Sequence, residues 1–197
     1  MQRIMKKVLC AALLLFSFVF AFGQSNKSAS VKDVKNITFY GVDFSISKAY
    51  GVVNTPSELK KAYTGINGLF ITESKKFNVP SFFKKDEVTN NFDLVNKLND
   101  EMNESGMIVN SKKPVIAPEQ LAAHVKSYKT GGKGVGLVFV AECLDKQFEI
   151  GYYHVVFFDE ATGDILYTKA VSGKAAGFGL RNYWAGSIYK IMKDWRY

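Results

Sequence analysis

The apolar residues of this chain recur with two periods, and each period predicts a different kind of element. Spacings of three and four residues predict amphipathic helices. They lie over about 56–72, 117–129 and 179–194. Runs rich in β-branched and aromatic residues predict strands. They lie over about 35–46, 134–145, 148–159 and 164–173. Gly41, inside the first of these strands, predicts a bulge or a close backbone approach.

The start of the first helix is the clearest local signal. Thr55 precedes Pro56, and Glu58 stands three residues after Thr55. This spacing predicts a capping box, in which two backbone N–H groups at the helix start gain side-chain acceptors. The expected buried stripe consists of Leu59, Tyr63, Ile66 and Phe70.

The segment 86–103 fits two interpretations. A helix would place Phe92, Val95, Leu98 and Met102 on one face, whereas alternation from Val88 onward fits a strand. We predict a strand over about 87–95 with a turn of helix after it, and the helical interpretation remains open.

The last helix and the strands before it suggest how the domain closes. The apolar stripe of this helix consists of Leu180, Trp184, Ile188, Ile191 and Trp195. The three preceding strands are closely spaced, with Gly163 at the second corner, and predict an antiparallel meander. We therefore expect residues 34–197 to form a single α+β domain. Its two layers would be a largely antiparallel sheet, with a C-terminal meander, and the amphipathic helices packed against it.

The N-terminus has the pattern of an export signal. Three basic residues precede an apolar run of 15 residues, 8–22, which is short for a membrane span of roughly 20 residues. We predict that residues 1–23 are a signal peptide cleaved after Gly23, and that 24–33 are a flexible lead-in. Cys10 lies near the start of the apolar run, which argues against lipidation at the cleavage site.

Charge and cysteine content argue against a nucleic-acid-binding protein and against a fold held by disulfides. Removal of the signal peptide lowers the formal net charge from +8 to +5, because three basic and no acidic residues leave. Lysines occur in scattered pairs among acids, whereas nucleic-acid-binding proteins more often concentrate basic residues in one stripe. We expect no nucleic-acid partner. Cys143 would be the one remaining cysteine, so we expect no internal disulfide.

Residues with recognisable chemistry are few. His124 and His154 lie 30 residues apart on different predicted elements and form no metal-ligand motif. Asp43, Glu142 and Asp159 lie on or near predicted strands and could converge on a hard cation, but no spacing requires it. The chain has no G-x-S-x-G nucleophile motif. We expect no catalytic residue, no metal and no cofactor.

The candidate contact site is the beginning of the last predicted helix. The glycine-rich segment before it lacks the residues of a Walker loop. Free backbone N–H groups at a helix start nevertheless attract anions. Arg181, Asn182 and Tyr183 have no evident packing role in the first turn, so we predict that they contact a ligand or partner.

Four segments carry a resemblance to known proteins. They are FYGVDFS at 39–45, GVGLVFVAE at 134–142, VVFFDEATGDIL at 155–166 and GFGLRNYWAGSIY at 177–189. Together they resemble a group of uncharacterised exported bacterial proteins, which implies no particular activity. The chain is more distantly similar to envelope lipoproteins of the curli-channel and TolB amino-terminal type. That similarity implies an α/β module for assembly and protein contact, although fold alone does not establish function.

These observations favour an exported, non-catalytic module, periplasmic or secreted, that contacts another cell-envelope protein. We expect no transmembrane helix in the mature chain. Two alternatives remain open: a binding protein for a small anion, glycan or lipid, and an enzyme of an unrecognised type.

Overall fold

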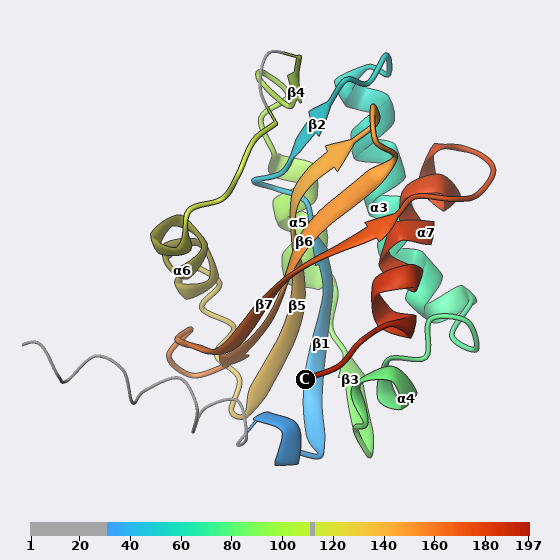
Figure 1. The fold of residues 1–197 in the computed structure, drawn as a ribbon. Coiled ribbons are helices and arrows are strands. Elements are labelled where there is room, and N and C mark those ends of the chain that lie inside the picture. Colours follow the sequence, from blue (N-terminus) through green and yellow to red (C-terminus); the bar gives the residue numbers. More distant parts are fainter. Residues whose placement is uncertain (1–30, 111–112) are drawn as a thin grey trace, which may run out of the picture.

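The computed structural model describes residues 31–110 and 113–197. The elements are β1 (Asn36–Asp43), β2 (Lys48–Tyr50), α3 (Pro56–Thr72), α4 (Val79–Phe83), β3 (Glu87–Asn90), α5 (Asp93–Glu101), β4 (Ile108–Val109), α6 (Pro118–Lys126), β5 (Val135–Asp145), β6 (Ile150–Asp159), β7 (Ile165–Lys174) and α7 (Leu180–Lys193). Figure 1 shows them arranged around one strongly curled sheet.

The sheet is built around β5. On one side β5 pairs in parallel first with β1 and then, further along, with β2. β3 and β4 extend this side by parallel pairing with β1 and β2. On the other side β5 pairs antiparallel with β6, and β6 with β7. The predicted C-terminal meander is therefore confirmed.

The prediction of a largely antiparallel, two-layer α+β fold is wrong. The sheet is mostly parallel and curls into a half-barrel with helices, an α/β-like arrangement (Figure 1). The reason is that helices separate β1 from β3 and β3 from β5 along the chain. A connection that crosses back over the sheet before the next strand makes the two strands parallel.

Two faces of the sheet carry different helices. α3, α4, α5 and α7 cover one face, where Phe44 stacks on Tyr63 of α3 with ring centroids 4.1 Å apart. α6 lies apart from them, at the left in Figure 1. It covers the opposite face of the sheet, where Tyr128, just after α6, contacts Phe158 of β6 with ring centroids 5.7 Å apart. We call these the aromatic face and the α6 face.

A buried bulge in β1 depends on two asparagines. The register with β5 shifts around Gly41, which has φ of 88°. Asn67 of α3 accepts from Val42 N at 2.8 Å, and Asn99 of α5 accepts from Phe44 N at 2.7 Å. A Cβ on Gly41 would lie 2.7 Å from Asn67 Oδ1. The bulge or close approach predicted at this glycine is confirmed.

The helices were predicted better than the short elements. α3 has the predicted bounds and capping box, and the predicted helices at α6 and α7 are confirmed, with α6 ending earlier. The ambiguous segment contains both a strand, β3, and a helix, α5, so each interpretation was right for part of it. Sequence periodicity missed α4, β2 and β4, which have five, three and two residues.

The signal peptide predicted over 1–23, and residues 24–30 of the lead-in, lie outside the described residues. Residues 31–33 form a helical turn with Val31 buried. The Lys85 ammonium holds this turn by donating to Val31 O at 2.8 Å and Val34 O at 2.7 Å. None of the helices in the part of the chain that the structure describes is long and apolar enough to cross a membrane.

Candidate functional site

The predicted contact residues lie in the first turn of α7. The Arg181 Nε donates to Asn182 Oδ1 at 3.0 Å, and the Arg181 stem lies against Gly65 of α3. The Lys146 ammonium, from the β5–β6 turn, sits 4.0 Å from the ring centroid of Tyr183. Arg181 and Tyr183 therefore have packing contacts that the sequence did not reveal. Their contact with a ligand or partner stays a prediction.

Both histidines lie on the α6 face, and each pairs with a carboxylate. The His124 Nε2 of α6 lies 2.7 Å from Asp43 Oδ2, at the end of β1. Tyr128 donates its hydroxyl to the same oxygen at 2.6 Å, and Ser45 N donates to Asp43 Oδ1 at 2.8 Å. Asp43 is fully buried. The Asp43 Oδ2 therefore joins β1 to α6 and to Tyr128, two residues beyond the end of this helix.

The surroundings of Asp43 keep it charged. Burial raises the pKa of this carboxyl, but the hydrogen bond and charge of His124, with help from Tyr128, outweigh burial and lower it. Burial and the nearby Asp43 charge together raise the pKa of Tyr128 well above its usual value. The tyrosine thus remains a hydrogen-bond donor and the aspartate an acceptor.

The second pair lies nearer the surface. The His154 Nε2 of β6 is 3.1 Å from Glu142 Oε2, which also accepts from Ile116 N at 2.9 Å. Burial raises the pKa of Glu142, but the hydrogen bonds from His154 and Ile116 lower it overall. The Lys113 ammonium lies 3.6 Å from the ring centroid of Tyr152, so the segment before α6 is also held to the sheet.

The two pairs flank one position of β5 without joining into one site. Val140 is the register partner of Asp43 on one side and of His154 on the other. Asp159 instead accepts from the backbone of its own hairpin, at Ala161 N and Thr162 N. Across residues 31–110 and 113–197, no group of three or more His, Cys, Asp or Glu side chains could hold a metal ion. The arrangement fastens α6 to the sheet.

From the sequence alone, the two histidines form no metal-ligand motif and have no predicted partner. One signal was present: His124 and Tyr128 stand four residues apart in a predicted helix, which places both on one face. Their shared acceptor, Asp43, lies 81 residues from His124. No local pattern connects residues at that separation.

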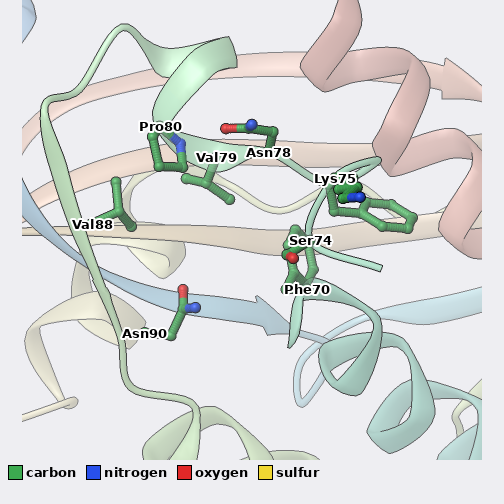
Figure 2. A pocket seen from close by; sticks show the side chains of 9 residues that line it. Phe70, Ser74, Lys75, Asn78, Val79, Pro80, Val88 and Asn90 are labelled. Atoms are coloured by element: carbon green, nitrogen blue, oxygen red, sulfur yellow. The ribbon is translucent and has the colours of Figure 1, made fainter. Parts of the chain in front are cut away.

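A pocket of about 320 Å³ opens between the end of α3, α4 and β3. Figure 2 shows Val88 and Asn90 of β3 on one side, facing Phe70 and Ser74 across the space. Its other lining residues are Lys75, Phe77, Asn78, Val79 and Pro80. This volume is at the low end of ligand pockets, which span about 300–1,000 Å³. It suits one or two apolar side chains better than a large cofactor.

The wall formed by β3 is also an edge of the sheet. Glu87 N donates to Lys35 O at 3.3 Å, and Asn91 N donates to Phe39 O at 2.9 Å, both toward β1. Backbone groups alternate in direction along a strand, so those of Val88, between them, face away from β1. The same holds for Asn90. No described strand pairs with this outer edge.

Comparison with known proteins adds no family to these observations. No family model matches the chain, and no curated protein matches it. The functional conclusions therefore rest on the residues and their geometry.

Proposed function

We propose that this protein is an exported, non-catalytic module, periplasmic or secreted, that contacts another cell-envelope protein. The observation that carries the proposal is the pocket beside the unpaired outer edge of β3. An exposed edge offers backbone hydrogen bonds to an extended segment, and an adjacent pocket offers selectivity for a side chain.

The chemistry of this pocket fits a peptide. Phe70, Phe77 and Val79 are almost wholly buried and provide apolar walls. Lys75 is the one charged residue in the lining, and no acidic side chain pairs with it among the described residues. A partner segment would place an apolar side chain in the pocket and a carboxylate near Lys75, with its backbone along Val88 and Asn90.

The commitment of both histidines to structural contacts supports a non-catalytic role. A general base must reach a substrate proton, usually within about 2.6–3.2 Å or through one water. Nε2 of each histidine instead faces a carboxylate that also holds the backbone or side chain of another element. The Nε2 atom of each histidine therefore serves a structural contact, in agreement with the proposed module.

Site-directed photo-crosslinking in native envelopes tests the proposal. A benzoylphenylalanine at Asn90 should give a reproducible protein adduct, whereas the same group at exposed Ser172 of β7 should not. No adduct from position 90, or the same adducts from both positions, would contradict a contact at this site.

A matched pair of variants tests the role of the backbone edge. Asn90→Pro removes an N–H that points away from β1, and Asn90→Ala keeps it. We expect Asn90→Pro to lower recovery of the adduct partner at least about five-fold relative to Asn90→Ala, because a partner carbonyl loses its donor. Circular dichroism should show equal folding of the two variants.

A further inference from the structure

Three exposed apolar side chains gather at one end of the molecule. Val53 is 100% exposed, Phe148 is 68% exposed and Phe178 is 96% exposed. They belong to three loops: the segment before α3, the β5–β6 turn and the segment before α7. Single exposed apolar residues are common, but a group of this kind on adjoining loops indicates an interaction surface.

Hydrogen bonds show that these loops adjoin. Lys146 N of the β5–β6 turn donates to Tyr50 O, just before the first loop, at 2.9 Å. On the other side of the turn, Ala175 N donates to Glu149 O at 2.7 Å. In Figure 1 the three loops lie at the upper right of the molecule. We call Val53, Phe148 and Phe178 the apolar tips.

Phe178 stands in a loop whose backbone needs a glycine on each side of it. It stands between Gly177, with φ of 136°, and Gly179, with φ of 79°. Other residues rarely adopt these angles. A Cβ on Gly177 would also lie 2.7 Å from Asn182 O, so the loop approaches α7 closely while its phenylalanine points into solvent. Exposing a phenyl ring is unfavourable unless another surface covers it.

Basic groups surround the apolar tips. Lys146, Lys174 and Arg181 lie on the same loops or next to them. The acids there are Glu149, in the β5–β6 turn, and Glu58, in the first turn of α3. Glu149 is 3.9 Å from each of the two lysine ammonium groups, and Glu58 accepts from Thr55 N, so these two acids do not balance the three cations. The α7 N-terminus adds partial positive charge, and no side chain caps it.

We propose that this end of the protein binds the surface of an anionic lipid bilayer. The apolar tips enter the boundary between headgroups and acyl chains, while Lys146, Lys174 and Arg181 contact headgroup phosphates. At their exposed fractions, Val53 and Phe178 protrude into solvent. Positive charge around protruding apolar groups complements a negatively charged bilayer.

Vesicle co-sedimentation tests the proposal on the protein as its host exports it. The probes are vesicles of phosphatidylcholine with phosphatidylglycerol at 3:1, and of phosphatidylcholine alone. We expect binding to the anionic vesicles, with weakening as salt rises. Phe178→Ser should lower the partition coefficient at least about ten-fold, because a buried phenyl group returns to water.

Ile71→Ser is the matched control for the apolar tips. Ile71 is 63% exposed but lies at the opposite end of α3 from Val53. At 1.5 Å per residue, this helix spans roughly 25 Å. The control should bind vesicles like the unmodified protein. Both variants keep the same N-terminus, so any lipid affinity of that segment cancels in the comparison.

A second pair separates charge from apolar contact. Arg181→Glu should lower partition to anionic vesicles about five-fold or more, and Lys126→Glu should not. Lys126 packs beside Gly163, at the far end of β6 from Phe148. Equal losses in each pair, or no binding to anionic vesicles, would overturn the proposal. A protein adduct from benzoylphenylalanine at position 178 without vesicle binding would overturn it in favour of a protein partner.

Discussion

The aromatic face and the α6 face of the same sheet are covered in different ways. On the aromatic face, four helices pack rings and aliphatic side chains against β1, β5 and β6, with Trp184 and Tyr63 fully buried. On the α6 face, one helix of nine residues buries only Leu121 and Val125 from within its own length. Buried hydrogen bonds to Asp43 supplement that small apolar area.

The difference shows that the length of a helix decides which interactions hold it to the sheet. A long amphipathic helix can be held by apolar burial, which gives about 25 cal/mol per Å² and does not depend on pH. A short helix buries little area, so a few polar contacts carry more of its attachment. Those contacts depend on charge. The aromatic face should therefore respond to changes of volume, and the α6 face to changes of protonation.

The largest expected effect is on the aromatic face. Trp184→Ala removes a fully buried indole from α7 and should lower the free energy of unfolding by about 3–5 kcal/mol. Urea unfolding followed by circular dichroism measures it. Phe178→Ala, at an exposed ring close by in sequence, is the control and should change stability by less than about 0.5 kcal/mol. A cost for Trp184→Ala no larger than that for Asp43→Asn would remove the contrast between the faces.

An intermediate effect is expected at Asp43. Asp43→Asn replaces a buried charged acceptor of Tyr128 and His124, and should cost about 2–3 kcal/mol at pH 7. The lowered pKa of Asp43 means that its ionised form stabilises the fold above the unfolded pKa of about 3.9. That contribution is lost as pH falls below 4 through the folded pKa.

A sharper measurement is the pH dependence of the difference in unfolding free energy between the unmodified protein and Asp43→Asn. Urea unfolding of the two proteins from pH 7 to pH 2 should show the stability gap constant at first and shrinking below about pH 4. A gap that persists unchanged at pH 2 would mean that the asparagine acts through shape and not through loss of charge.

The smallest expected effect is at the rim of the α6 face. Glu142→Gln keeps an oxygen for Ile116 N but weakens the contact with His154, and should cost about 1 kcal/mol. Hydrogen exchange should rise first in the segment before α6. Glu149→Gln, which loses only exposed ion pairs at 3.9 Å, should cost close to zero. Equal costs would show that Glu142 behaves as an ordinary surface acid.

The predicted features that proved correct are those fixed by neighbouring residues. Thr55 and Glu58 stand three residues apart, so the start of α3 could be predicted from the chain alone. The meander of β5, β6 and β7 has short turns, which bring consecutive strands together antiparallel. Gly41 indicated a bulge, but nothing indicated the two asparagines that accept hydrogen bonds from Val42 N and Phe44 N.

The candidate sites were less predictable because their parts are distant in sequence. The pocket joins Phe70 at the end of α3 to Asn90 of β3, and its edge depends on which strand pairs with β1. The strand at β3 was predicted, but no local pattern shows that it pairs with β1 and forms an edge of the sheet. The apolar tips come from three loops whose proximity follows from the pairing of β2 with β5 and from the position of α7.

The sequence by itself determined the helices α3, α6 and α7, the bulge glycine and the C-terminal meander, because each depends on residues within a few positions of one another. Only the tertiary structure decided that β1 and β2 pair in parallel with β5. It also decided that Asp43 accepts a hydrogen bond from Tyr128, which lies 85 residues away in the sequence. Hydrogen-bond partners at such separations are selected by how the helices cross the sheet. That choice reflects packing of the whole chain, which no local pattern contains.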